Sequence, residues 1–345
     1  MEKFQHGGQI YDEFGNAVNF LDFSANINPL GLSEKISKTL TENFAGVVNY
    51  PDPNATELKN SISRRYKVSQ ENLILLNGAA EFFYLFCNVF RPKKILIPVP
   101  SFSEYERAAK SSGAEVEFFF TKAEENFQLD VKKLLEKNAD CIILGRPNNP
   151  TGNLISIEEI LKLAEKFSVV VDESFIDFLP IESVRNFLTE KIFVVQSLTK
   201  IFAIPGLRLG FAVAEKNFAE KLNFAKDVWN VNFLAQKAGV AALSDEKFLQ
   251  DTRNWLEVEK KYFAEKLREF DGVKVFEPSV NFILIQLENK KIAENILEKF
   301  REKNILVRNC ENFTGLGGRF LRLAIRSREE NNLLLKSFSA IITNC

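Results

Sequence analysis

The chain has 345 residues, and its 45 Lys and Arg against 46 Asp and Glu give a formal net charge of −1; the length allows about two domains, and the charge balance gives no electrostatic footprint for nucleic acid or an anionic membrane. No charged-then-apolar signal segment opens the chain, and no uninterrupted apolar run reaches the ~18 residues of a membrane span. The single histidine, His6, excludes multi-histidine metal sites, and the four scattered cysteines predict free thiols in a reducing cytoplasm.

The N-terminal stretch is polar and turn-rich. His6-Gly7-Gly8 is followed by an aperiodic run from Leu21 to Gly31, which contains Asn26. We expect an extended arm rather than a helix. From composition alone, a flexible terminus remains the simpler interpretation of His6 and Gly7.

A turn at Tyr50-Pro51-Asp52-Pro53 and a helix over 56–66 come next. A buried strand over 73–76 then ends at Gly78-Ala79-Ala80, before an apolar helix. Small residues at such a turn leave backbone N–H groups free to bind a phosphate at the helix N-terminus. Without a full Walker or Rossmann pattern, this signal is weak by itself.

Strands and helices alternate from here on, which predicts a three-layer α/β/α domain with a mostly parallel sheet. Four apolar runs each lead into a turn with polar or aromatic side chains: 95–97 before Phe102, 141–144 before Asn149, 169–171 before Asp172, and 192–195 before Ser197. Because ligands bind beyond the carboxyl ends of the strands in such sheets, we expect all four turns at one edge.

The stretch from Ser197 to Gly210 organises the rest of the interpretation. A strand over 192–196 stops at two hydroxyl residues and Lys200, and a second strand over 207–214 begins after Pro205-Gly206. This predicts that Lys200 lies on a loop between two core strands. Such a lysine is usually a solvated surface charge. Arg208 and Ser197 in the same stretch instead suggest a covalently held anionic ligand.

After Ala214 the sequence becomes helical and charged, with a long helix expected over 245–270. Strands over 280–287, 305–308 and 320–325, with a helix over 292–303, predict a smaller α+β domain. Arg308 and Arg322 lie on these strands, where most arginines occupy solvated edges.

The string from Ser197 to Gly210 resembles the lysine motif of fold-type I pyridoxal-phosphate enzymes. Its part from Ala203 to Gly210 resembles the threonine-phosphate decarboxylase branch, which is close to histidinol-phosphate aminotransferases. The resemblance runs from His6 to about Glu330 and implies the fold-type I PLP-dependent transferase-like fold. The expected parts are an N-terminal arm (1–40) belonging to the small domain, a large PLP-binding domain (41–228) and a small C-terminal α+β domain (229–345).

For the cofactor, the resemblance implies that Lys200 attaches pyridoxal 5′-phosphate covalently, and to do so its amine must be neutral. The resemblance also implies that Asp172 holds the pyridine nitrogen protonated, although an Asp there also suits a cap of the next turn. It further implies that Asn149 bonds the phenolic oxygen and that Phe102 stacks on the ring. The phosphate contacts implied are Gly78, Ala79, Ala80, Ser197 and Arg208, with Tyr50 reaching across the interface of a homodimer.

For the substrate, the resemblance implies contacts from His6, Gly7, Asn26, Asn149, Arg308 and Arg322. Many aminotransferases have a tyrosine three residues after the aspartate, where this chain has Phe175. The decarboxylase branch also has Phe at that position, so the difference favours a decarboxylase.

The expected function is decarboxylation of O-phospho-L-threonine to (R)-1-aminopropan-2-yl phosphate in cobalamin biosynthesis. The partners expected are this small phosphorylated amino acid and a second copy of the chain. The first alternative is a histidinol-phosphate aminotransferase, which also needs a phosphate-ester site. A non-catalytic pyridoxal-phosphate sensor is a third, more distant possibility.

Overall fold

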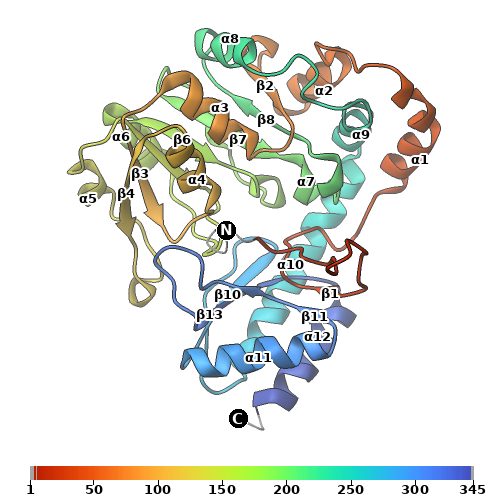
Figure 1. The fold of residues 1–345 in the computed structure, drawn as a ribbon, viewed down its shortest axis with the longest axis vertical. Coiled ribbons are helices and arrows are strands. Elements are labelled where there is room, and N and C mark those ends of the chain that lie inside the picture. The colour runs from red at the N-terminus through yellow and green to blue at the C-terminus, as the bar shows by residue number, and fades with distance from the viewer. Residues whose placement is uncertain (1–3, 5, 343–345) are drawn as a thin grey trace.

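The computed structural model describes residue 4 and residues 6–342, and its upper half in Figure 1 is built around a seven-stranded sheet. The strand order is β2-β8-β7-β6-β5-β3-β4, and β8 is antiparallel to both of its neighbours, whereas the other pairs are parallel. These strands are β2 (Leu73–Leu76), β3 (Lys94–Val99), β4 (Glu115–Phe120), β5 (Cys141–Gly145), β6 (Ser168–Asp172), β7 (Ile192–Ser197) and β8 (Gly210–Val213).

Helices cover both faces of this sheet because its central strands are apolar on both sides. Val170 packs in the layer of α3 (Glu81–Phe90), α4 (Glu104–Ser111) and α8 (Lys216–Ala225), whereas Val169 and Val171 pack with α5 (Val131–Leu135) and α6 (Ile157–Lys166). A further apolar cluster joins β2 and β8 to α2 (Thr56–Tyr66) and α9 (Phe233–Leu243). The predicted three-layer, mostly parallel α/β/α arrangement is confirmed.

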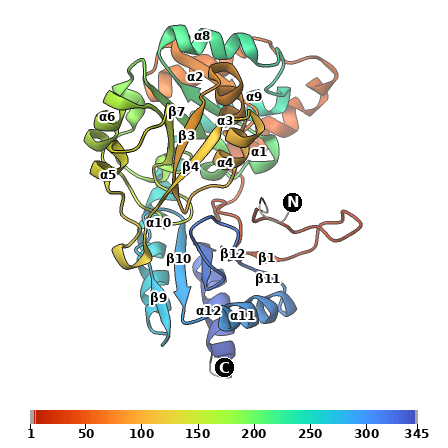
Figure 2. The ribbon, with the colours of Figure 1, turned by 60° about the vertical axis from the view of Figure 1, so that its left-hand side comes forward.

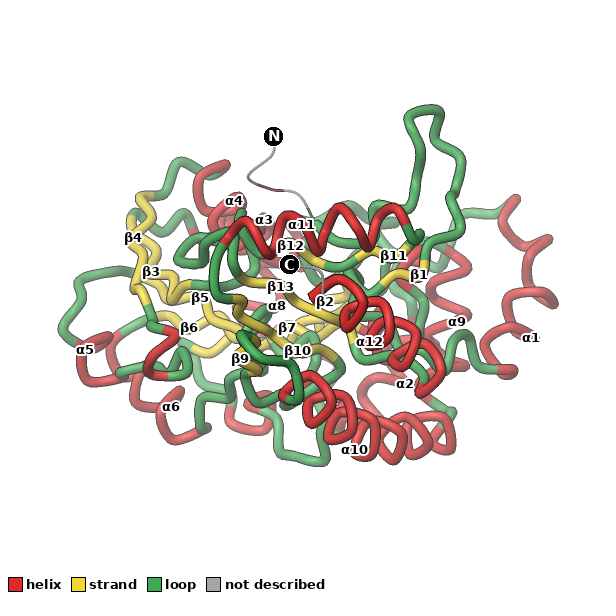
Figure 3. The backbone as a smooth tube through the Cα atoms, turned by 90° about the horizontal axis from the view of Figure 1, so that it is seen from below, coloured by secondary structure: helices red, strands yellow, loops and turns green. Residues whose placement is uncertain are grey.

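The lower half contains a smaller antiparallel sheet in the order β12-β13-β10-β9. Seen from below, helices lie around its strands (Figure 3). The elements are β9 (Val273–Val275), β10 (Phe282–Leu287), β12 (Arg308–Asn309), β13 (Phe320–Ala324), α10 (Glu246–Arg268), α11 (Lys290–Glu302) and α12 (Arg328–Ile342).

The N-terminal arm joins this smaller part. Its strand β1 (Leu21–Asp22) pairs in parallel with β11 (Ile305–Leu306), and the loop before β1 projects from the body in Figure 2. The arm leads into α1 (Glu34–Asn43), which begins at Ser33, whose side chain accepts a hydrogen bond from the backbone N–H of Ile36. The predicted domain boundaries at 40/41 and 228/229 stay a prediction.

Short helices complete the fold. One is α7 (Leu198–Ile201), and the others are 3-10 turns at Phe44–Val48, Gln70–Asn72, Ala123–Glu125, Ile176–Phe178, Val184–Phe187 and Pro205–Leu207. Within residue 4 and residues 6–342, no helix combines the length and the apolar character that crossing a bilayer requires.

Three predicted elements are wrong in detail. Lys200 lies on α7 rather than on a loop, because the side chain of Ser197 caps a helical turn there by accepting from the N–H of Thr199. The following strand begins at Gly210 rather than at residue 207, since Pro205 starts a 3-10 turn and Arg208 is left-handed (φ 57°). The strand expected over 305–308 is two strands: β11 pairs with the arm and β12 pairs with β13.

The parallel pairing fixes where the site lies. Since β3, β5, β6 and β7 run in one direction, the turns after all four lie at one edge of the sheet, as predicted. The antiparallel β8 starts at that same edge, which brings Arg208 beside the end of β7.

Candidate active site

A cavity of about 620 Å³ lies where this sheet edge faces the arm and the smaller sheet. Its lining therefore comes from three parts of the chain. Most of the residues predicted from the sequence line it: His6, Gly7, Asn26, Ala79, Ala80, Phe102, Asn149, Asp172, Ser197, Lys200, Arg208, Arg308 and Arg322. Of the remaining two, Gly78 contacts a lining residue and Tyr50 lies elsewhere.

Lys200 projects into this cavity from α7. Its Nζ donates a hydrogen bond to Thr199 Oγ1 (2.9 Å), which in turn lies 2.6 Å from Ser197 Oγ. Burial, together with the positive charge of Arg208, lowers the pKa of Lys200 to about 8, although Asp172 acts in the opposite direction. A larger share of the amine is therefore neutral and nucleophilic near neutral pH than for an exposed lysine.

Asp172 ends β6 and is buried. Its Oδ1 accepts from the backbone N–H of Ser174 (2.9 Å), and its Oδ2 accepts from the hydroxyl of Tyr105 (2.7 Å). Burial raises the pKa of Asp172, and these hydrogen bonds and the charge of Lys200 oppose that rise. The cavity thus has a carboxylate whose two oxygens are both held by donors.

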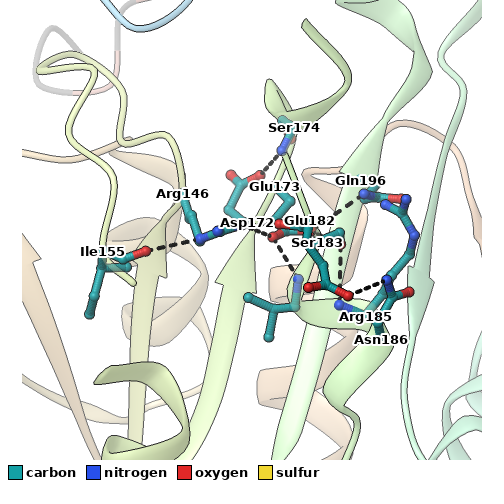
Figure 4. A network of polar contacts seen from close by, with 11 residues as sticks. Arg146, Ile155, Asp172, Glu173, Ser174, Glu182, Ser183, Arg185, Asn186 and Gln196 are labelled. Carbon is teal, nitrogen blue, oxygen red and sulfur yellow. Dashed lines mark hydrogen bonds and ion pairs between the residues drawn. The ribbon is translucent and has the colours of Figure 1, made fainter. Parts of the chain in front are cut away.

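A buried polar network lies behind Asp172 (Figure 4). Arg146, just after β5, donates to Glu173 Oε1 (2.8 Å) and to the carbonyl of Glu182 (3.0 Å). Glu173 also accepts from Ser183 and from the backbone N–H of Val184. Because consecutive residues at the end of a strand point to opposite faces, this network holds the ends of β5 and β6 from the side away from the cavity.

Gly78 and Arg208 form a compact cationic corner. Gly78 has φ +83°, and a Cβ there would lie 2.1 Å from Nη2 of Arg208, so this close approach requires glycine. The corner lies just before the N-terminus of α3, where backbone N–H groups and the helix dipole favour an anion. A guanidinium beside a helix N-terminus is suited to a phosphate group.

Arg308 and Arg322 face each other as register partners on β12 and β13. Arg322 donates to Asn149 Oδ1 (2.5 Å) and to the carbonyl of Ser24 (2.6 Å), and its buried Nε has no hydrogen-bond partner among the described residues. Burial lowers the pKa of Arg322 to about 10. Arg308 donates to Asn312 (2.6 Å) and lies over the ring of Phe313. Two neighbouring cations thus form one wall of the cavity.

The N-terminal arm closes another side of the cavity. A Cβ at Gly7 would lie 2.1 Å from the carbonyl oxygen of Ser24, and the N–H of Gly8 donates to Ser24 Oγ (2.8 Å). His6 Nε2 lies 2.8 Å from Glu104 Oε1, and its ring is 5.3 Å from that of Phe102. The predicted group of His6, Gly7 and Asn26 is therefore brought to the cavity.

Tyr50 lies outside this cavity. It is 78% exposed and stacks on Trp229, with 4.4 Å between the ring centroids. Its predicted contact with the cofactor requires a second copy of the chain and stays a prediction.

Sequence reasoning missed Glu104 and Tyr105, which are both buried in the first turn of α4. The signal in the sequence that could have identified them is that the run Glu104-Tyr105-Glu106 closely follows Phe102. Acidic residues in a first helical turn usually indicate a solvated cap, so their burial was not visible before the fold.

The lining fits pyridoxal phosphate. It offers an amine, a carboxylate, a ring and a cationic corner at a helix N-terminus, from Lys200, Asp172, Phe102 and Arg208. The buried Arg322 Nε and Asn26 Oδ1 also have no partner among the described residues, which suits a site that a polar ligand completes.

Residues 18–338 match the family described as aminotransferase class I and II, and the chain belongs to that family. Its cofactor is accordingly pyridoxal 5′-phosphate, as predicted.

Two sequences and one solved structure are similar to this chain over nearly its whole length. It is 39% identical to a putative threonine-phosphate decarboxylase of Caldanaerobacter subterraneus subsp. tengcongensis, over 99% of this chain and 95% of that one. It is 36% identical to an adenosylcobalamin biosynthesis bifunctional protein of Leptospira interrogans, over 98% of this chain and 41% of the other. The crystal structure of a histidinol-phosphate aminotransferase from Clostridium acetobutylicum superposes with a TM-score of 0.87 at 33% identity, covering 94% of this chain and 99% of that one. The predicted fold-type I fold is confirmed.

Proposed function

We propose that this protein is a pyridoxal-phosphate-dependent carboxy-lyase that decarboxylates O-phospho-L-threonine to (R)-1-aminopropan-2-yl phosphate, a step of cobalamin biosynthesis. The observation that carries the proposal is the wall formed by Arg308 and Arg322, with His6 at the same cavity. Three cationic or cation-capable groups in a chain of net charge −1 suit a substrate with a carboxylate and a phosphate. The similarity to decarboxylases supports the same assignment.

Each residue then has a role. Lys200 attaches the cofactor, Asp172 holds its pyridine nitrogen protonated, and Arg208 with the backbone of Gly78, Ala79 and Ala80 holds its phosphate. When bound, the cofactor supplies an electron sink for the pair released as the bond from Cα to the carboxylate breaks. Arg308, His6 and Asn26 hold the substrate phosphate, Arg322 orients its carboxylate, and Lys200 Nζ returns a proton to Cα.

Phe175 favours the lyase over a transaminase. Its buried ring lines the cavity and packs against Phe282, 5.2 Å away between centroids. A phenylalanine at this position donates no hydrogen bond to the cofactor, which matches the decarboxylase pattern described above.

The second candidate is a histidinol-phosphate aminotransferase, which the similarity to the solved structure of one favours. It would need a second half-reaction with a 2-oxo acid. The test supplies O-phospho-L-threonine alone in one arm, and histidinol phosphate with 2-oxoglutarate in the other, and identifies the products by NMR. We expect an amino-alcohol phosphate in the first arm. Faster formation of glutamate in the second arm would replace the lyase with the transaminase.

We also propose a homodimer in which each active site uses Tyr50 of the partner subunit. Tyr50 stacks on Trp229, which is 42% exposed, and Val48, two residues before Tyr50, is 84% exposed. Apolar side chains gathered in this way are typical of an interface.

The shared site can be tested by mixing subunits. Lys200→Ala and Tyr50→Ala are each expected to be inactive as homodimers. If Tyr50 acts across the interface, a mixed dimer contains one intact site, and random mixing restores about a quarter of wild-type activity. No restoration in a verified mixed dimer would show that Tyr50 does not act across the interface.

We place the protein in the cytoplasm. Cys87, Cys141 and Cys310 are buried thiols, and unpaired thiols suit a reducing compartment.

A further inference from the structure

Tyr105 is a fully buried residue of α4 whose hydroxyl donates to Asp172 Oδ2 at 2.7 Å. Resting on the proposed function, we propose that Tyr105 is a positioning residue that aims the carboxylate of Asp172 into the cavity and braces the ring of Phe102. It thereby supports both groups assigned to the cofactor ring, from a position in the wall of the same cavity.

The direction of the hydrogen bond follows from the chemistry of the pair. An ionised carboxylate only accepts, so the Tyr105 hydroxyl is the donor. Burial, with the nearby charge of Asp172, raises the pKa of Tyr105 well above its ordinary value, so the hydroxyl keeps its proton. Because Oδ1 is already held by the N–H of Ser174, a donor on Oδ2 fixes the rotation of the carboxylate.

The ring of Tyr105 has a second contact role. It meets Phe102 edge-on, with 5.7 Å between centroids and an interplanar angle of 85°, and it lies 4.7 Å from Phe83. Edge-to-face pairs of this kind hold aromatic rings in defined orientations. Phe102 itself lines the cavity. The side chain of Tyr105 therefore both supports the ring proposed to stack on the cofactor and holds the carboxylate of Asp172.

Tyr105 is held firmly by its neighbours in the helix. Glu104 is fixed by His6 and by the hydroxyl of Tyr84 (2.6 Å), and Glu106 is fixed by Lys110 (2.7 Å). Since successive helical residues point about 100° apart, the three side chains reach three different surroundings, and contacts on both sides limit rotation of this turn.

Two variants separate the hydroxyl from the ring. Tyr105→Phe keeps the aromatic contacts and removes only the donor. Phe86→Leu loosens the same apolar layer, where Phe86 stacks on Phe82, without touching Asp172. The measured quantities are the dissociation constant of pyridoxal phosphate, obtained by titrating cofactor-free enzyme, and the melting temperature.

We expect Tyr105→Phe to weaken cofactor binding about tenfold, since a hydrogen bond to a charged group is lost. Turnover of the loaded enzyme should fall by a similar or larger factor, with KM changed much less. Phe86→Leu should lower the melting temperature and leave the cofactor dissociation constant unchanged.

The deciding experiment is a double-mutant cycle with Asp172→Asn, read as cofactor affinity. If Tyr105 acts through Asp172, adding Tyr105→Phe to Asp172→Asn should change the dissociation constant by less than about twofold. An equal effect of Tyr105→Phe in both backgrounds would overturn the proposal. The proposal would also fail if Tyr105→Phe, like Phe86→Leu, lowered the melting temperature and left the cofactor dissociation constant unchanged. Affinity is independent of reaction type, so a failed lyase assignment would be recognised separately, from the products of the wild-type enzyme.

Discussion

Among the residues that the structure describes, burial lowers the pKa of two lysines, Lys200 and Lys226, to about 8. Lys226 lies outside the cavity and donates to the carbonyl of Leu75 and to Asn230. A lowered pKa is therefore not sufficient for function. Lys200 differs because it faces an anion-binding corner and a buried carboxylate.

This difference predicts the pH dependence of cofactor attachment. Only the neutral amine attacks, so the rate at which cofactor-free enzyme captures pyridoxal phosphate should rise from about pH 6 to about pH 9, with a midpoint near 8. Borohydride reduction and peptide mapping should then find the label on Lys200. A label on Lys226, or a midpoint near that of an exposed lysine, would contradict this account.

The buried carboxylate of Asp172 is expected to lower the stability of the folded protein. Its folded-state pKa is raised by burial, so its charged form is less favourable in the folded than in the unfolded protein. Cofactor-free Asp172→Asn should therefore melt above wild type at neutral pH. The difference should shrink as pH falls through the raised folded-state pKa and disappear below the unfolded value of about 4. Thermal denaturation across this range is the measurement, and a lower melting temperature at pH 7 would be the contrary result.

Among individual residues, the sequence predicted those that lie together in one short motif, such as Lys200 and Arg208. It did not predict Tyr105, because its partner Asp172 is 67 residues away. No short-range pattern in the sequence marks a hydrogen bond between α4 and β6.

Among the elements, α4 contacts three parts of the site. Glu104 holds His6 of the arm, Tyr105 holds Asp172, and Thr314 of the loop before β13 reaches Glu106 (3.4 Å). The arm and the loop between β12 and β13 thus both contact one short helix beside the larger sheet.

This arrangement predicts a selective effect of Glu104→Gln. Losing the charge that holds His6 should raise KM for O-phospho-L-threonine severalfold. The increase should be smaller than a fully buried charge-assisted contact would give, because the side chain of His6 is 43% exposed. The cofactor dissociation constant should not change. Glu106→Gln, two residues along the same helix, is the matched control and should leave KM unaltered. Equal effects of the two variants would mean that the helix, rather than the contact with His6, is responsible.

The predicted helices and strands are correct where the apolar pattern of the sequence determines the structure. They are wrong where the chain changes direction within a few residues. The strands at 73–76 and 169–171 are correct because their runs are apolar on both faces. The strand expected over 305–308 changes sheets at Val307, which depends on two distant partners. The helical turn at Lys200 depends on a cap from Ser197 that a strand-like pattern concealed.

For the whole molecule, the large mostly parallel sheet and the smaller C-terminal α+β part follow from the sequence, but the shape of the site does not. The cavity collects residues from His6 to Arg322, and only the folded chain shows that Arg322 meets Asn149 and Ser24. The role that we propose for Tyr50 would need a second copy of the chain as well.

The most direct test of the proposed decarboxylation is the amount of carbon dioxide released per active site from O-phospho-L-threonine without any 2-oxo acid. We predict steady release over many equivalents, because a lyase regenerates its cofactor in every cycle. No carbon dioxide, together with a single equivalent of a keto product and further turnover only after 2-oxoglutarate is added, would contradict it and identify a transaminase.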